Sequence, residues 1–395
     1  MIKRLFSTII LSIIACVAVN AQGLCVINGH IADSRLGDGS ELKKVYLTRV
    51  NEFGQPVTVA EAKVKKGSYT FEYELAQDEP VLLYTVAGFG EGMGIELFVE
   101  PGEITVNTPS AAQPCVSKVV GTPVNDAYTE FMDIFANGYK EVEKEVAALV
   151  SANSNEWLGS AEGKAAVGRI ESKEGIKTLS QTIRFLIGHN ASPMMPLVVE
   201  CYLLHLLTPA YAEQVMNAVS TSLYTHPYYL SLRNRVLANN LKVGNEAPDI
   251  TLHLLGGETK RLSDYRGKYV VLNFWASGCA KSAEMFAELQ KLYDLVKEYG
   301  DEFVIVSVSL DTDKAAWAKA VESNGINREG WLHACDGAGT VSPAAEFFGL
   351  ENTPKILLIE PEGRAVSLDM EIGEVVMRAD QILMGDLYYL DQIEE

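Results

Sequence analysis

The stretch that decides the fold of this chain is residues 269–282, which read YVVLNFWASGCAKS. Its first half is an apolar run that predicts a buried strand. Its second half brings Cys279 to the first turn of a helix, whose apolar positions continue to about Tyr299. The free N–H groups and the macrodipole at a helix N-terminus favour a thiolate. The stretch therefore predicts a reactive thiol at Cys279.

Two neighbours of Cys279, Lys281 and Ser282, are expected to affect its pKa and its disulfide chemistry. Lys281 adds a nearby cation, and a cation lowers the pKa of a thiol from its free value of about 8.5. Ser282 stands three residues after Cys279, where a dithiol site carries its second cysteine. Its hydroxyl can donate a hydrogen bond to the sulfur but cannot form a disulfide. The pattern predicts mixed-disulfide chemistry in which an external thiol, or Cys335 if the fold brings it close, releases the product.

The region around this stretch, residues 243–395, alternates β and α patterns. The run 303–310 is continuously apolar, as in a strand buried on both faces of a sheet. Residues 355–360 predict another strand with a hairpin mate, and Asp311 with Thr312 is expected to cap the helix that follows the run 303–310. A last helix is predicted over Met377–Gln392. These patterns together predict an α/β domain with a mixed central sheet.

These residues resemble the thioredoxin superfamily, in particular the exported thioredoxin-like proteins related to cytochrome-c-maturation reductases. The resemblance covers about residues 243–395 and rests on Val243-Gly244, Ala247-Pro248-Asp249, Leu262–Lys268, Asn273–Ser277, Val308–Asp311, Trp317, Trp331 with His333, and Thr353-Pro354. It implies a thioredoxin fold and a disulfide-exchange activity. It also implies that Pro354 is the family's cis-proline and that Trp275, Thr353 and Pro354 contact the substrate.

The site departs from the family's Trp-Cys-x-x-Cys pattern at two positions. Gly278 stands in place of the tryptophan, and Ser282 stands in place of the resolving cysteine. Peroxiredoxins, the nearest alternative in the superfamily, place Pro and Thr seven and three residues before their reactive cysteine. Leu272 and Ala276 occupy these positions here, which argues against that class.

Two functions remain open at this point. In the first, Cys279 performs single-cysteine disulfide exchange or isomerisation on periplasmic protein thiols, and an external thiol or a membrane reductant donates the electrons. In the second, the domain is a catalytically degenerate binding or scaffold module for cell-envelope proteins, and a groove beside Pro354 holds an extended peptide. The reaction rate of Cys279 with an alkylating reagent distinguishes these two functions.

Two further regions precede the α/β domain. Residues 22–121 contain short β-branched and aromatic runs between turn signals, which predict a small all-β sandwich or barrel. Residues 122–242 carry apolar positions at helical spacing and predict an α-helical connector. Neither region shows a metal-ligand cluster or a catalytic constellation. They look like the N-terminal regions that are fused to thioredoxin-like proteins in Gram-negative exported chains.

The first 21 residues predict a secretory signal peptide. A cationic start, Met1–Arg4, precedes the apolar run Leu5–Val19, and Ala21 ends a small-residue cleavage site. The run is shorter than the roughly 20 residues that a spanning helix needs. We therefore expect a periplasmic protein that begins after Ala21. The alternative is a lipoprotein anchored to the membrane at Cys16, because residues 13–16 resemble a loose lipoprotein box.

Composition and cysteine content add limits on partners. The 395 residues include 33 Lys+Arg and 52 Asp+Glu, a net charge of −19, which argues against nucleic acid or an anionic lipid surface as a partner. No metal, nucleotide or haem is implied.

Without Cys16, five cysteines remain, an odd number that leaves a thiol unpaired. Cys25 and Cys115 bracket the β region and are a candidate disulfide pair, and Cys201 lies in an apolar run that predicts burial.

Overall fold

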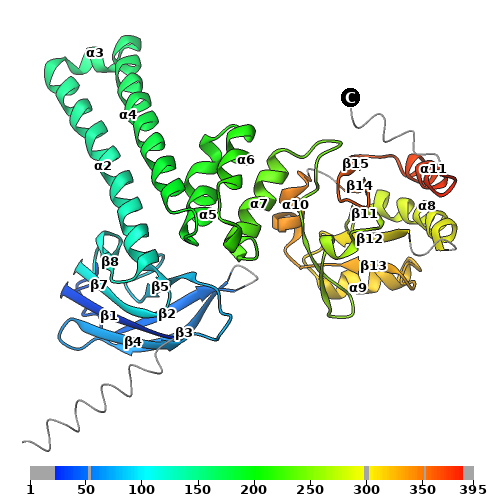
Figure 1. Ribbon diagram of the computed structural model, residues 1–395, viewed down its shortest axis with the longest axis horizontal. Coiled ribbons are helices and arrows are strands. Elements are labelled where there is room, and N and C mark those ends of the chain that lie inside the picture. Colours follow the sequence, from blue (N-terminus) through cyan, green and yellow to red (C-terminus); the bar gives the residue numbers. More distant parts are fainter. Residues whose placement is uncertain (1–22, 52–54, 298–301, 351–352, 386–395) are drawn as a thin grey trace, which may run out of the picture. The chain divides into compact units, whose positions relative to one another are not determined.

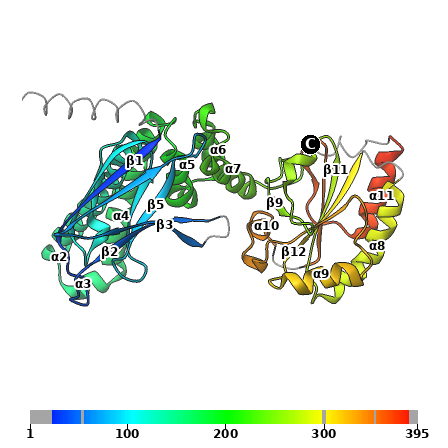
Figure 2. The same ribbon diagram turned by 90° about the horizontal axis from the view of Figure 1, so that it is seen from below.

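The computed structural model describes residues 23–51, 55–297, 302–350 and 353–385. The chain divides into two units: residues up to 205 with 217–229, and residues 206–216 with 230 onward (Figure 1, Figure 2). The helical connector predicted as one segment is therefore shared between the two units. The predicted signal peptide, residues 1–21, lies outside the described residues. Over the described ranges, we find no helix with the length and apolar character needed to cross a bilayer.

The first unit opens with a β-sandwich, which confirms the all-β region predicted from the sequence. Its strands are β1 (Leu24–Asp33), β2 (Lys44–Val50), β3 (Pro56–Lys63), β4 (Ser68–Glu74), β5 (Leu82–Ala87), β6 (Gly94–Val99), β7 (Gly102–Ser110) and β8 (Lys118–Val120). They form two sheets with the orders β4-β1-β7-β8 and β3-β2-β5-β6. Alternate residues of β1, such as Ile27 and Ile31, point inward and share one apolar core with Val45 and Leu47 of β2.

Helices follow the sandwich within the same unit. They are α2 (Pro123–Ala152), α3 (Asn155–Gly159), α4 (Ala161–Gly188), α5 (Met194–Val198) and the π-helical turn η2 (Val199–Leu203). α2 and α4 run side by side as a long hairpin (Figure 1). Glu100, 7% exposed, ties α2 to the sandwich, because its Oε1 accepts hydrogen bonds from the N–H groups of Val124 (2.9 Å) and Asn125 (3.3 Å). A carboxylate at a helix start satisfies donors that the helix itself cannot.

The second unit holds a five-stranded mixed sheet in the order β13-β12-β11-β14-β15. Its elements are α6 (Pro209–Asn217), α7 (Pro227–Asn239), β9 (Thr251–His253), β10 (Thr259–Arg261), β11 (Tyr269–Trp275), α8 (Ala280–Val296), β12 (Phe303–Ser309), α9 (Lys314–Ser323), β13 (Trp331–Ala334), α10 (Pro343–Phe347), β14 (Lys355–Ile359), β15 (Ala365–Ser367) and α11 (Ile372–Leu383), where α6 and α7 each extend in part into the first unit. β11, β12 and β13 are parallel, and β14 and β15 are antiparallel to their neighbours.

Both faces of this sheet are buried, as the continuous apolar run of β12 predicted. Side chains of α8, α9 and α11 pack with Val271 and Trp275 on one face. On the other face, side chains of β9 and α10 pack with Val270 and Leu272. β11 is the central strand of the sheet, so the loop after it emerges from the middle of the domain.

The last helix begins earlier than the sequence predicted. α11 starts at Ile372 and not at Met377, because Glu371 and Glu374 form a capping box at its N-terminus. The N–H of Glu371 donates to Glu374 Oε2 at 3.3 Å. Residues 386–395, into which the predicted helix extended, lie outside the described residues.

The predicted positions of three cysteines need correction. Cys25 and Cys115 are both free thiols rather than a disulfide. Cys25 points into the sandwich core with 0% exposure, while Cys115 lies in the exposed turn η1 (Pro114–Val116). Cys201 is exposed and not buried. It lies in the π-helical η2, whose wider turn changes which residues of the apolar run face outward.

Candidate functional site

The site is built where β11 ends and α8 begins. Cys279 is the N-cap residue of α8, and the loop that leads to it is closed by a hydrogen bond from the N–H of Cys279 to the carbonyl of Ala276 at 3.0 Å. The carbonyl of Cys279 accepts the first bonds of the helix, from Ser282 at 3.1 Å and Ala283 at 3.4 Å. The fold therefore places the thiol at the positive end of the helix dipole, as predicted.

The second segment of the site is Thr353-Pro354, just before β14. The peptide bond between these two residues is cis. The thiol of Cys279 donates a hydrogen bond to the carbonyl of Thr353, with 3.4 Å between sulfur and oxygen. Cys279, Thr353 and Pro354 are all half-buried. The fold thus brings three sequence-predicted site residues together across a gap of more than 70 positions in the chain.

The pKa of the Cys279 thiol is lowered from its ordinary value. The Ser282 hydroxyl is the largest cause, and the Ser282 backbone N–H, the Thr353 hydroxyl and the Lys281 backbone N–H act in the same direction. Partial burial opposes them. Donors near the sulfur stabilise the thiolate, and together they outweigh the loss of solvation. Lys281 is exposed and contributes through its backbone N–H, whereas the sequence had pointed to its ammonium group.

Ser282 is buried, with 1% of its surface exposed. Its Oγ has no hydrogen-bond partner among the described residues. A buried hydroxyl without a partner is costly, so this hydroxyl is free to donate to the sulfur of Cys279, whose pKa it lowers.

Trp275 is not placed to contact a substrate. It is 1% exposed and packs edge-on against Phe286, with ring centroids 4.8 Å apart. It is the last residue of β11 and shares the core face with Val271. The role predicted for Trp275 in substrate binding is therefore wrong. Its role is to fill the core directly beneath the loop that carries Cys279.

The burial of Cys335 argues against the role of resolving thiol that the sequence left open. It is 1% exposed, and its Sγ donates to the backbone carbonyl of Asp311 at 3.4 Å. Burial raises the pKa of Cys335, which disfavours the thiolate that an exchange reaction needs. Cys25 is also unreactive by this criterion, because burial in the sandwich raises its pKa to about 11.

Asp311 is a site residue that the sequence interpretation misplaced. The cap of α9 is Asp313, whose Oδ1 accepts from the N–H groups of Ala315 (2.9 Å) and Ala316 (3.1 Å). The carboxylate of Asp311 instead accepts three hydrogen bonds from Ser277, two from its N–H at 3.1 and 3.2 Å and one from its hydroxyl at 2.7 Å. Asp311 therefore holds the loop just before Cys279.

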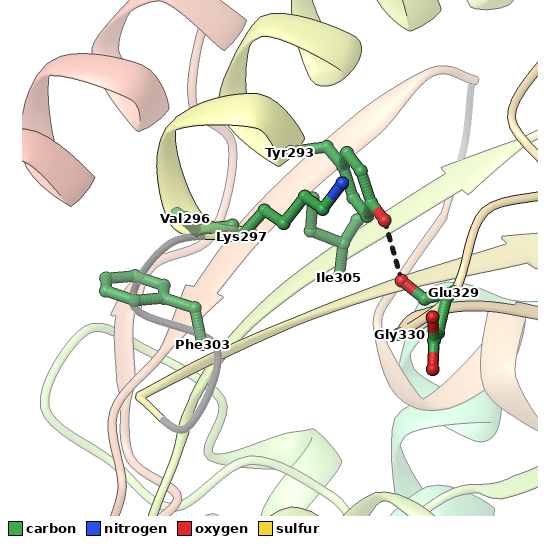
Figure 3. A pocket seen from close by; sticks show the side chains of 7 residues that line it. All are labelled: Tyr293, Val296, Lys297, Phe303, Ile305, Glu329 and Gly330. Atoms are coloured by element: carbon green, nitrogen blue, oxygen red, sulfur yellow. Dashed lines mark hydrogen bonds between the residues drawn. The ribbon is translucent and has the colours of Figure 1, made fainter.

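A separate cleft lies at the other end of α8 (Figure 3). Its lining consists of Tyr293, Val296, Lys297, Phe303, Ile305, Glu329 and Gly330. The hydroxyl of Tyr293 donates to the carbonyl of Glu329 at 2.8 Å across it. None of the predicted site residues lines this cleft. Within the described ranges, we also find no group of three or more His, Cys, Asp or Glu side chains that could hold a metal ion.

Comparison with known proteins agrees with this architecture. Residues 243–364 match the model of the AhpC/TSA family, and residues 25–128 match a domain of unknown function, DUF4369. The C-terminal region therefore has a thioredoxin fold, preceded by an all-β domain and a helical region. The expectation of this fold class is confirmed.

Individual relatives are thiol-disulfide oxidoreductases. The chain is 44% identical over 66 residues to thiol-disulfide oxidoreductase ResA of Geobacillus kaustophilus, a match that covers 17% of this chain and 38% of the relative. It is 29% identical over 140 residues to ResA of Bacillus subtilis, over 35% of this chain and 74% of the relative. The first relatives are thus matched over less than two fifths of their length.

Solved structures are also similar to part of this chain. The thioredoxin domain of a thiol-disulfide oxidoreductase from Bacteroides vulgatus is 29% identical, and the match covers 36% of this chain and 98% of that domain with a TM-score of 0.33. The C-terminal domain of this chain is a thioredoxin-like domain related in sequence to thiol-disulfide oxidoreductases.

Proposed function

We propose that this protein is an exported thiol-disulfide oxidoreductase that works through a single cysteine, Cys279, on protein thiols and disulfides of the periplasm. The observation that carries the proposal is the pairing of Cys279 with Ser282. Cys279 is half-buried at the N-cap of α8 with a lowered pKa. The position one turn along holds a hydroxyl, so no second thiol is available there.

The reaction proceeds in two exchanges. The Cys279 thiolate attacks one sulfur of a substrate disulfide, a Cys279–substrate disulfide forms, and the other substrate sulfur leaves as a thiolate that takes up a proton. A second thiolate then attacks the mixed disulfide and releases Cys279. In isomerisation the second thiolate belongs to the substrate itself. In net reduction it comes from an external dithiol: its first sulfur forms a disulfide with the substrate as Cys279 leaves as a thiolate. Its second thiol then attacks that disulfide, which frees the substrate thiol and leaves the external dithiol as an intramolecular disulfide.

Insulin with its disulfides intact is a substrate that tests this proposal directly. Wild-type protein mixed with insulin, then quenched with acid and alkylated, is expected to carry an insulin chain in disulfide linkage to Cys279, as read by mass spectrometry of the adduct. Cys279→Ala is expected to form no adduct, and Cys335→Ala, the matched control in which a buried thiol is removed, is expected to form it as wild type does. Absence of the adduct in wild type would leave the binding or scaffold role.

Export is tested separately. In a Gram-negative host, the intact mass of the purified protein is expected to correspond to a chain that begins at Gln22, because residues 1–21 have the pattern of a signal peptide. A mass that retains Met1 contradicts export. A mass that includes lipid on Cys16 replaces the soluble periplasmic form with an anchored one.

A further inference from the structure

The residue before Cys279 has no structural reason to be glycine. Gly278 does not adopt a positive φ. A Cβ built on it would meet no atom within 4 Å, and the position is exposed. Glycine therefore adds conformational freedom next to the reactive thiol without relieving any clash or strain. The bond from the Cys279 N–H to the Ala276 carbonyl closes the turn across Gly278, so what anchors this turn decides where the thiol lies.

The end of β12 supplies two anchors for this loop. The N–H of Leu310 donates to the carbonyl of Trp275 at 2.8 Å. The carboxylate of the next residue, Asp311, accepts hydrogen bonds from both the N–H and the hydroxyl of Ser277. Its carboxylate is itself held by the hydroxyl of Ser309 at 2.6 Å. Only Gly278 remains between this anchored segment and Cys279.

We propose that Asp311 is the positioning residue of the site: by fixing Ser277 it keeps Cys279 at the N-terminus of α8 and within reach of the Thr353 carbonyl. The inference rests on the proposed role of Cys279 as the reactive thiol. The donors that favour the Cys279 thiolate, chiefly Ser282, act only at short range. Loss of the Asp311–Ser277 hydrogen bonds (the clamp) leaves the turn closed only by the bond from the Cys279 N–H to the Ala276 carbonyl. Rotation at Gly278 then moves Sγ away from those donors.

The charge of Asp311 and its positioning role predict opposite results. A carboxylate near a thiolate raises the pKa of the thiol by repulsion, so removal of the charge alone lowers that pKa. Loss of positioning removes stabilising donors and raises it. Lys281, two residues after Cys279, is exposed and keeps its charge in both cases. The direction of the change therefore identifies the role.

The experiment compares two aspartates on the same loop. Alkylation of Cys279 by iodoacetamide is followed by peptide mass spectrometry from pH 5 to 10 in wild type, Asp311→Ala and Asp313→Ala. We expect Asp311→Ala to slow alkylation at pH 7 by roughly fivefold and to shift the pH midpoint upward. Asp313→Ala, which loses an equal charge and the cap of α9, should stay within about twofold of wild type. An unchanged or lowered midpoint in Asp311→Ala would overturn the proposal.

A second pair of variants keeps the test valid if Asp311→Ala folds poorly. Ser277→Ala deletes one hydroxyl from the clamp and should produce a smaller slowing in the same direction. Gly278→Ala limits the freedom of the loop, so Asp311→Ala should cost at least about twofold less in that background. Equal costs in both backgrounds contradict a role through loop flexibility. Since alkylation does not require disulfide exchange, an effect here without an insulin adduct would overturn the proposed function and leave the positioning role standing.

Discussion

Cys279 and Cys335 show how one domain shifts the pKa of two thiols in opposite directions. Cys279 lies at a helix N-cap, half-buried, with hydroxyl and N–H donors around its sulfur. Cys335 follows β13 inside the apolar core, and its thiol donates to a backbone carbonyl. Both thiols donate to a backbone carbonyl at 3.4 Å, so the difference lies in the balance between donors and burial. Donors to the sulfur outweigh burial at Cys279 and lower its pKa, whereas burial outweighs the donors at Cys335 and raises its pKa. The direction of each pKa shift therefore follows from the element that carries the cysteine.

The largest difference between the two thiols is expected in native alkylation. At pH 7 Cys279 should react with iodoacetamide at least about a hundredfold faster than Cys335, because Cys335 must wait for local opening of the core. Time-resolved peptide mass spectrometry of the folded protein measures both rates in one sample. Comparable alkylation rates for Cys279 and Cys335 would contradict the expected difference in reactivity between the two thiols.

The buried thiol of Cys25 extends the comparison to stability. Its pKa rises from 9.0 to about 11 on folding, so the unfolded chain ionises first as pH rises. The folded state keeps its full stability with respect to Cys25 below about pH 9, where the thiol is neutral in both states. Between about pH 9 and pH 11 ionisation of the unfolded chain lowers the free energy of unfolding, by on the order of 2–3 kcal/mol in all. Denaturant titrations at pH 8 and pH 11 should show that the alkaline loss is smaller in Cys25→Ala by this amount. Cys279→Ala should show no such relief, because the pKa of Cys279 shifts the other way.

Ser282→Cys should make the site of Cys279 a dithiol. The replacement is close to isosteric at a buried position, and intramolecular release should raise insulin reduction with dithiothreitol by at least about tenfold. Turbidity of the reduced insulin chain measures the rate. A folded Ser282→Cys protein without this gain would show that another feature of the site, such as Gly278, limits turnover.

The smallest effect is expected for Cys335→Ala. Release of the Cys279–insulin adduct by dithiothreitol should proceed within about twofold of the wild-type rate, since Cys335 is buried and its pKa is raised. The cost should appear as lower stability, roughly 1–2 kcal/mol from lost packing. A release rate that falls tenfold would identify Cys335 as a resolving thiol after all.

The sequence predicted the elements better than it predicted what each side chain touches. The strands and the helix that place Cys279 follow from apolar runs and turn residues, which act locally. The role of Trp275 could not be read in this way, because an aromatic next to an active-site loop points either outward or into the core, and strand alternation with Val271 decides it. The choice between Asp311 and Asp313 as the helix cap depended on where the chain turns after β12. Cys201 was misjudged because a π-helical turn breaks the helical period.

The parallel pairing of β1 with β7 bears on how the first domain is made. Ile27 pairs with Ile104. The first strand therefore has no partner on this side until most of the sandwich has been synthesised. Closing such a distant pair is slow compared with forming hairpins such as β5–β6. Until then, an edge of β1 with unpaired backbone groups is open to pairing with other chains. The domain is therefore expected to depend, during its biogenesis, on protection of its first strand.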